Sequence, residues 1–139
     1  MSHGGQEDRA IEDAADLLEE RFRPLAIVLF GSRARSLEHV GSDHDLAILT
    51  GRPVPDPFAL AAAKVDLEQI LGTDVDLVLL DEASPIIAME LLRAHRLLRA
   101  RDREAFESFV VHTIGAYFDL KRVREPIEAA LLGGAREAR

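Results

Sequence analysis

The sequence predicts a single α/β domain of the α+β type, with a small mixed β-sheet flanked by helices and a helical C-terminal third. Three observations predict this fold. Apolar side chains recur at helical spacing over residues 7–22. Short apolar runs bounded by Pro, Gly or Asp are typical of buried strands. The loop between the first two runs is too short for a crossover helix, which favours antiparallel pairing.

The first half of the chain predicts one helix and two strands. Residues 7–22 form the helix, and Pro24 ends it. The continuous apolar run 25–30 predicts a strand buried on both faces, and a short helical turn is expected over 32–36. Residues 43–49 form the second strand. Strand alternation places Asp43, Asp45 and Ala47 on one face and His44, Leu46 and Ile48 on the other.

The second half alternates again between helix and strand. Asp56 is placed to cap a helix that begins at Pro57 and ends at Gly72. The β-branched and apolar segment 73–80 predicts the third strand. Another helix is expected to begin at Ser84-Pro85.

The C-terminal third is predicted to be helical around an apolar stripe. Residues 96–99 fit a strand or a helix equally well, and residues 103–122 predict a long helix that Pro126 breaks. Tyr117 and Phe118 are expected in the core, with a partner-binding face as the alternative. We therefore expect one domain over residues 1–139, with a core of about residues 8–100, a C-terminal helix of about 103–122 and a short tail.

Composition restricts the classes of partner. The chain has 139 residues, 17 Lys and Arg against 25 Asp and Glu, a net charge of −8, and no cysteine. This acidity disfavours a nucleic-acid partner, and the basic runs 93–103 and 121–124 are interpreted as solvated helix faces. No apolar run reaches the roughly 20 residues that span a bilayer, and no secretory signal is recognised. The sequence therefore predicts a cytoplasmic protein without membrane contact.

Gly31-Ser32 directly follows the first predicted strand. Glycine allows the backbone to approach a ligand closely, and the serine hydroxyl and nearby backbone N–H groups can donate to phosphate oxygens. Taken alone, the pair is weak evidence for a phosphate site, because it is far more often an ordinary turn.

Asp43 and Asp45 give the second strand an acidic face. Aspartates are rare within strands, and two on one face lie about 7 Å apart along the strand, where a bound cation relieves their repulsion. Carboxylate oxygens suit Mg²⁺. The alternative is an exposed edge strand that uses Asp for solubility, but the apolar residues that follow disfavour it.

A third carboxylate, Asp76, interrupts an otherwise apolar strand. If the second and third strands are neighbours, Asp76 meets Asp43 and Asp45 on one face. Three such carboxylates would suit two metal ions that serve an in-line phosphoryl displacement. Asp74 shares this face and competes for the role, but its place at the strand entrance also suits a turn.

These motifs in this order resemble the nucleotidyltransferase superfamily that includes DNA polymerase beta. The combination of Gly31-Ser32-Arg33-Ala34-Arg35 with Ser42-Asp43-His44-Asp45-Leu46 resembles its minimal nucleotidyltransferase (MNT) antitoxin branch. The resemblance covers about residues 8–80 and includes all three carboxylates. It departs at His44, where the superfamily often has an apolar residue. We interpret His44 as structural, because it points away from the acidic face.

The resemblance implies a nucleotidyltransferase fold, two Mg²⁺ ions and ATP as nucleotide donor. Gly31 and Ser32 would hold the β and γ phosphates, and Arg33 and Ser42 are candidate nucleotide-binding residues. Arg33 fits a solvated helix face equally well. The catalytic residues and metal ligands would be Asp43, Asp45 and Asp76. Members of this branch are commonly antitoxins of HEPN-domain toxins, so the implied function is transfer of AMP to a tyrosine of a cognate toxin, within a hetero-oligomer. The alternatives are neutralisation of the toxin by binding alone, and transfer to a small molecule such as an aminoglycoside.

Overall fold

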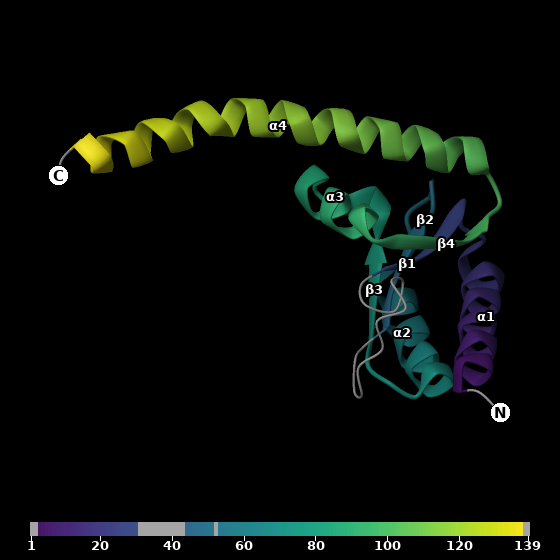
Figure 1. The fold of residues 1–139 in the computed structure, drawn as a ribbon. Helices are drawn as coiled ribbons and strands as arrows, with labels where there is room; N and C mark the ends of the chain where they lie inside the picture. The colour runs from purple at the N-terminus through teal and green to yellow at the C-terminus, as the bar shows by residue number, and fades with distance from the viewer. Residues whose placement is uncertain (1–2, 31–43, 52, 138–139) are drawn as a thin grey trace.

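The computed structural model describes residues 3–30, 44–51 and 53–137. Figure 1 shows a small sheet with helices packed against it and a long C-terminal helix, which confirms the predicted fold class. The elements are α1 (His3–Phe22), β1 (Ala26–Phe30), β2 (His44–Leu49), α2 (Pro57–Leu71), β3 (Val75–Leu79), the 3₁₀ helix η1 (Leu80–Glu82), α3 (Pro85–Arg93), β4 (His95–Ala100) and α4 (Arg103–Glu137). Within the described residues, no helix combines the length and the apolar character needed to cross a membrane.

The four strands form one mixed sheet in the order β3-β2-β1-β4. β1 pairs antiparallel with β2 and with β4, whereas β2 pairs parallel with β3. The antiparallel β1–β2 pair confirms the expectation from the short loop, and the β2–β3 pair confirms that the two Asp-bearing strands are neighbours. β4 settles the ambiguous residues 96–99 as a strand.

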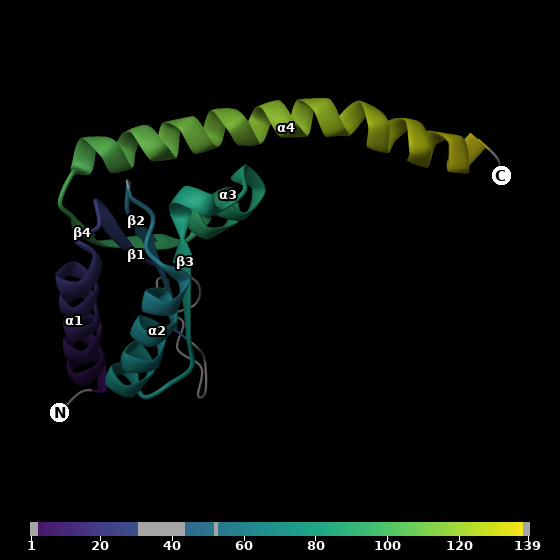
Figure 2. The same ribbon diagram turned by 180° about the vertical axis from the view of Figure 1, so that it is seen from behind.

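Helices cover both faces of the sheet. The views in Figures 1 and 2 place α1 and α2 on one side, and α3 with the first turns of α4 on the other. Leu46 and Ile48 belong to the apolar cluster that includes residues of α1 and α2, whereas Ala47 and Leu49 belong to the cluster that includes Leu92 and Phe106. The alternation predicted for β2 is therefore confirmed from residue 44 to residue 49, and Asp45 shares the face of Ala47.

The predicted start and end of α2 and the predicted start of α3 are confirmed by their caps. The Asp56 side chain accepts a hydrogen bond from the backbone N–H of Phe58, at 3.1 Å. Gly72 ends α2 in the left-handed conformation, with φ of 71°, which a residue without a Cβ adopts at little cost. The Ser84 hydroxyl accepts from the backbone N–H of Ile87 at 3.2 Å.

The C-terminal helix corrects two predictions. It continues through Pro126 to Glu137, so the predicted break and short tail are wrong. Proline removes one backbone hydrogen bond and crowds the preceding turn. The residues on both sides of Pro126 are nevertheless helical. Figure 1 shows α4 curving along its length. Phe118 is 48% exposed, and Tyr117 is half-buried, so the expected placement of this pair in the core is wrong as well.

The basic run 93–103 also differs from its interpretation as a solvated helix face, because most of it forms strand β4. Arg99 donates to Asp16 and Glu12 of α1, both at 2.8 Å. These hydrogen bonds, first that to Asp16 and then that to Glu12, raise the pKa of Arg99, so its guanidinium stays charged. Arg101 donates to the backbone carbonyls of Pro24 and Arg23. These arginines therefore tie β4 to α1 and to the segment that follows it.

Candidate active site on strands β2 and β3

Two of the three predicted carboxylates lie on neighbouring strands at the same level. Asp45 of β2 and Asp76 of β3 are register partners in the parallel pair. Neighbouring strands lie about 4.8 Å apart, and register partners direct their side chains to the same face. Asp45 is half-buried and Asp76 is exposed. The register thus brings two carboxylates together at a surface that solvent, and therefore a ligand, can reach.

The competing carboxylate, Asp74, lies just before β3. Its backbone carbonyl accepts from the backbone N–H of His44 at 3.1 Å, so its main chain aligns the entrances of the two strands. Its side chain is exposed. Because the register pairs Asp45 with Asp76, the geometry favours Asp76 over Asp74 as the partner carboxylate.

His44 is buried on the opposite face from Asp45, with 2% of its surface exposed. Its Nδ1 lies 2.7 Å from the Thr73 hydroxyl, and its Nε2 lies 3.2 Å from a carboxylate oxygen of Glu7. The imidazole therefore links the start of β2 to α1 and to the residue that precedes Asp74. The structural interpretation of His44 is confirmed by these contacts.

Glu7 and Thr73 were not recognised from the sequence as partners of His44. They lie 37 and 29 residues away from it, and no local spacing connects them. The available signal is a polar residue at a position that alternation directs into the core, since a buried polar group requires hydrogen-bond partners.

A further acidic residue, Asp81, lies at the other end of the same strands and has a structural role. One of its oxygens accepts from the backbone N–H and the hydroxyl of Thr50, at 2.8 and 3.0 Å. The other oxygen accepts from the backbone N–H of Gly51 at 2.8 Å. These three hydrogen bonds attach the end of β2 to η1, so Asp81 is occupied in holding the sheet together.

The carboxylates that the structure places together fit a magnesium site by the chemistry of their donors. Asp45 and Asp76 offer hard oxygen ligands, which Mg²⁺ binds together with water and phosphate oxygens. Among the described residues, no group of three His, Cys, Asp or Glu side chains is close enough to hold a metal. The remaining predicted site residues lie outside the described part of the chain: Gly31, Ser32, Arg33, Ser42 and Asp43. The short helical turn expected over 32–36 lies there too.

Comparison with known proteins places this geometry in a family. Residues 12–104 match the family model described as polymerase beta, nucleotidyltransferase. The Shewanella oneidensis protein named protein adenylyltransferase MntA is 31% identical over 112 residues, which cover 80% of this chain and 79% of the relative.

Solved structures agree with this assignment. A chain from a toxin–antitoxin crystal structure with AMP-PNP superimposes with a TM-score of 0.77 at 29% identity, over 87% of this chain and 98% of that chain. A chain from a structure of tri-AMPylated Shewanella oneidensis HEPN toxin in complex with MNT antitoxin gives a TM-score of 0.76 at 26% identity, over 91% and 98% of the two chains.

The matched segment 12–104 contains the whole sheet, including both register-paired carboxylates. Sequence, topology and the acidic pair on β2 and β3 thus lead to one conclusion: this chain belongs to the polymerase beta family of nucleotidyltransferases.

Proposed function

We propose that this chain is the antitoxin of a HEPN toxin, and that it neutralises the toxin by transferring AMP from ATP to a tyrosine hydroxyl, with two Mg²⁺ ions. The observation that carries the proposal is the pairing of Asp45 with Asp76 at an exposed sheet position. The similarity to a protein named protein adenylyltransferase, and to chains from structures that hold a HEPN toxin or AMP-PNP, supports the donor and the acceptor. Its site of action would be the cytoplasm.

The two carboxylates have different environments, which suit different roles. Asp45 is half-buried near the start of β2, whose other residues are buried, so its position is fixed by the sheet. Asp76 is exposed and can meet an incoming hydroxyl. Bound Mg²⁺ would neutralise charge on the triphosphate and on the leaving pyrophosphate. We assign Asp45 to coordination of Mg²⁺. We assign Asp76 both to coordination of Mg²⁺ and to acceptance of the hydroxyl proton.

The proposed reaction balances without a further reactant. The tyrosine oxygen forms a bond to the α-phosphorus of ATP, and the bond from that phosphorus to the bridging oxygen of pyrophosphate breaks. The hydroxyl proton passes to the Asp76 carboxylate and then to solvent. Asp43 remains a prediction as the carboxylate that joins Asp45 and Asp76 in the metal site. Gly31 and Ser32 remain predicted to hold the β and γ phosphates, with Arg33 and Ser42 at the nucleotide.

The test uses the full chain, the cognate HEPN protein, Mg²⁺, and ATP labelled at either the α or the γ phosphate. We expect label on the toxin from α-labelled ATP alone, and loss of at least about 1,000-fold in rate for Asp45→Asn, because a site carboxylate acts directly on the reaction. The matched control, Asp74→Asn, changes an exposed carboxylate two residues from Asp76 and should keep most of the activity. Transfer from γ-labelled ATP, or equal rates in Asp45→Asn and wild type, would refute the proposal.

A second candidate, neutralisation by binding without catalysis, is favoured by one observation: the far half of α4 carries exposed apolar side chains that the catalytic core does not require. An experiment in cells that express the toxin distinguishes the two candidate functions. If the Asp45→Asn, Asp76→Asn double variant protects these cells as well as wild type does, binding alone suffices. If the complex forms but protection disappears, transfer of AMP is required.

A further inference from the structure

A buried polar side chain directly precedes one member of the acidic pair, Asp45 and Asp76. His44 points to the opposite face of the sheet from Asp45 and is 2% exposed. An apolar side chain would fill this position without any partner, whereas a buried imidazole costs stability unless its nitrogens are hydrogen-bonded. Both nitrogens have partners, the Thr73 hydroxyl at 2.7 Å and the Glu7 carboxylate at 3.2 Å. We call Glu7, His44 and Thr73 the His44 network.

The His44 network fixes the register position next to the acidic pair. His44 and Val75 are register partners, directly before the pair of aspartates. The backbone N–H of His44 donates to the carbonyl of Asp74 at 3.1 Å, and the Thr73 hydroxyl donates to the same carbonyl at 3.2 Å. The same hydroxyl contacts the His44 ring. The entrances of β2 and β3 are thus joined through the main chain and through side chains.

The position of β3 depends on this junction. β3 is an edge strand in the order β3-β2-β1-β4, and within the described sheet it pairs with β2 alone. Two carboxylates on neighbouring strands, about 4.8 Å apart, repel each other until a cation binds, and this repulsion acts to separate the strand entrances. Mg²⁺ requires near-ideal octahedral geometry, and a site works well only when its ligands lie within about 0.5 Å of the productive arrangement. A junction that fixes the two strands at this level therefore influences how well the pair binds the ion.

Glu7 extends the junction to helix α1. Its side chain is 20% exposed, and its carboxylate faces the Nε2 atom of His44. α1 is itself attached to the sheet, since Arg99 of β4 donates to Glu12 and Asp16, both at 2.8 Å. The imidazole is therefore held against a helix that is fixed to the opposite edge strand.

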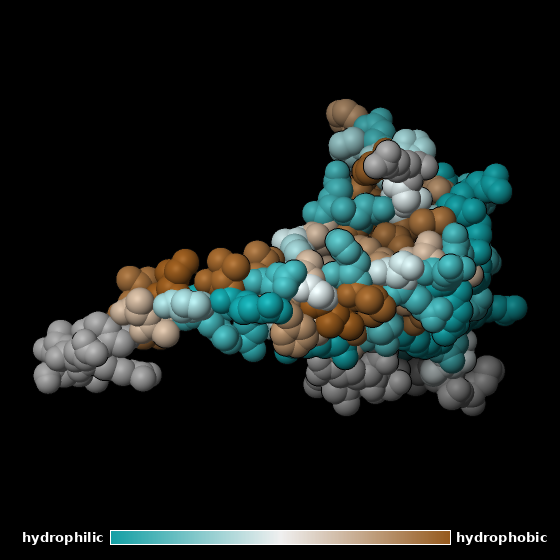
Figure 3. Space-filling view, turned by 90° about the horizontal axis from the view of Figure 1, so that it is seen from above, coloured by the Kyte–Doolittle hydropathy of each residue, from teal (hydrophilic) through white to brown (hydrophobic). Residues whose placement is uncertain are grey.

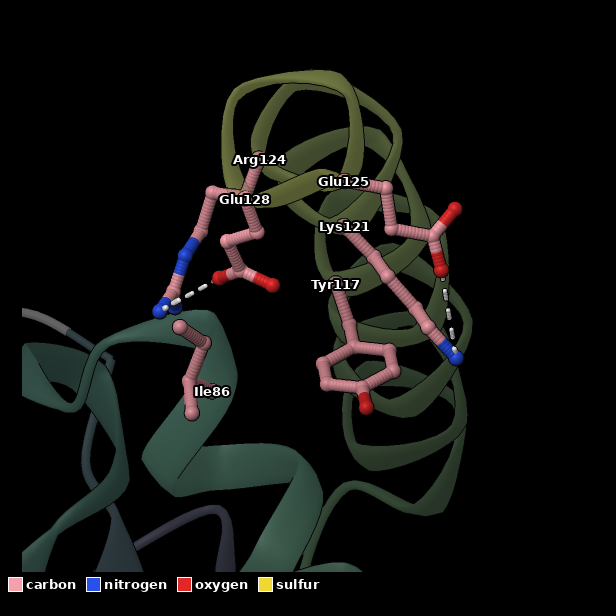
Figure 4. Close-up of a pocket in the computed structure, with 6 residues that line it drawn as sticks. All are labelled: Ile86, Tyr117, Lys121, Arg124, Glu125 and Glu128. Atoms are coloured by element: carbon pink, nitrogen blue, oxygen red, sulfur yellow. Dashed lines mark ion pairs between the residues drawn. The ribbon is translucent and has the colours of Figure 1, made fainter. Parts of the chain in front are cut away.

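The surfaces formed by α3 and α4 are separate from this junction. A pocket of about 230 Å³ lies between the two helices, and Figure 4 shows Ile86 and Tyr117 beside it; all six lining residues belong to α3 and α4. Figure 3 shows hydrophobic side chains gathered on the projecting part of α4. The hydrogen bonds that reach the entrance of β2 come instead from α1 and from Thr73.

The far end of β2 has its own anchor, which provides a matched control. There Asp81 accepts from the backbone N–H groups of Thr50 and Gly51. Thr50 lies five residues after Asp45, about 17 Å along an extended strand, whereas His44 is adjacent to Asp45. Loss of the Asp81 anchor should therefore lower stability without moving the acidic pair, whereas loss of the His44 network should do both.

We propose that Glu7, His44 and Thr73 are positioning residues of the metal site, which hold Asp45 and Asp76 in the arrangement that Mg²⁺ requires. This inference rests on the proposed function, because it takes Mg²⁺ as the ion at this pair. The His44 ring lies on the face away from Asp45, so the network acts through the positions of the strands and not by contact with ATP. Its removal weakens the Mg²⁺-dependent part of ATP binding.

The test measures Kd of ATP for the full chain by calorimetry, without the toxin, once with Mg²⁺ and once with EDTA. Thr73→Val removes the hydroxyl and keeps the shape of the side chain, Thr73→Ser keeps the hydroxyl, and Glu7→Ala removes the contact with α1. We expect Kd with Mg²⁺ to rise about 10-fold in Thr73→Val and in Glu7→Ala, as for other residues that orient metal ligands. Kd in EDTA should change less than about 3-fold in both variants. Thr73→Ser should stay within about 3-fold of wild type under both conditions.

The control Asp81→Asn separates positioning from stability. Urea unfolding of every variant measures the loss of stability, and Asp81→Asn should keep the wild-type Kd with Mg²⁺ although it is destabilised. Four outcomes would overturn the inference: wild-type Kd in Thr73→Val and Glu7→Ala, an equal loss in Asp81→Asn, no restoration by Thr73→Ser, or no effect of Mg²⁺ on wild type.

AMP transfer to the HEPN protein is measured separately on the same samples. If the variants change Mg²⁺-dependent ATP binding as expected but wild type transfers no AMP, the proposed function alone is refuted. If wild type transfers AMP and the variants bind ATP with Mg²⁺ as wild type does, the present inference alone is refuted.

Discussion

Replacing Asp81 with alanine tests how the strand that carries Asp45 is held in place. The carboxylate accepts three hydrogen bonds, two from Thr50 and one from Gly51, at distances of 2.8 to 3.0 Å. Asp81→Ala removes both acceptor oxygens and all three hydrogen bonds, and leaves the backbone N–H groups of Thr50 and Gly51 without these acceptors. Thr50 is only 8% exposed, so water replaces the lost acceptors poorly there.

The magnitude follows from these contacts. A hydrogen bond to a charged group contributes about 1.5 kcal/mol or more to stability, and partial exposure of Asp81 reduces this. Three bonds at roughly 1 kcal/mol each give a loss of about 3 kcal/mol in the free energy of unfolding. Asp81→Asn keeps one carbonyl acceptor but directs an N–H group at a donor, so it should lose about 1 to 2 kcal/mol.

Urea unfolding followed by circular dichroism measures both variants against wild type. For a chain of this size, a loss of 3 kcal/mol lowers Tm by about 10 °C. AMP transfer at low temperature should be nearly unchanged, because Asp81 is bound at the end of β2 away from Asp45. A loss below about 1 kcal/mol in Asp81→Ala, or a ranking with Asp81→Asn as the less stable variant, would contradict this account.

Two further substitutions test other parts of the structure. His44→Leu removes the hydrogen bonds to Thr73 and Glu7 from a buried position, so we expect a loss of about 2 to 3 kcal/mol in urea unfolding; an unchanged midpoint would show that these contacts are dispensable. Pro126→Ala restores a backbone N–H in the middle of α4, so we expect amide exchange around residues 120–132 to slow by about 10-fold or more, with little change in the global midpoint. Unchanged exchange there would mean that the proline does not weaken the helix.

The sheet and its acidic pair were predictable because local patterns specify them. Alternation along β2 placed Asp45 on one face and His44 on the other, and capping residues set both ends of α2. The neighbouring position of β2 and β3 followed from a hypothesis about shared carboxylates, and the register that pairs Asp45 with Asp76 agrees with it. The roles of these carboxylates, and of Gly31, Ser32, Arg33, Ser42 and Asp43, remain predictions.

The errors have different physical causes. Proline ends many helices, but α4 is helical on both sides of Pro126. Phe118 fits an apolar stripe by sequence alone, yet about half of its surface, 48%, is exposed on α4. The partners of His44 lie too far along the chain for any spacing to reveal them.

The central claim is that Asp45 and Asp76 act together at one site. It is tested most directly by a double-mutant cycle on single-turnover AMP transfer to the HEPN protein, with Asp45→Asn, Asp76→Asn and the combined variant. Residues that serve one site are strongly non-additive, so we expect each single variant to lose about 1,000-fold or more and the double variant to lose little beyond that. Losses that multiply in the double variant, or a single variant that retains the wild-type rate, would contradict the account.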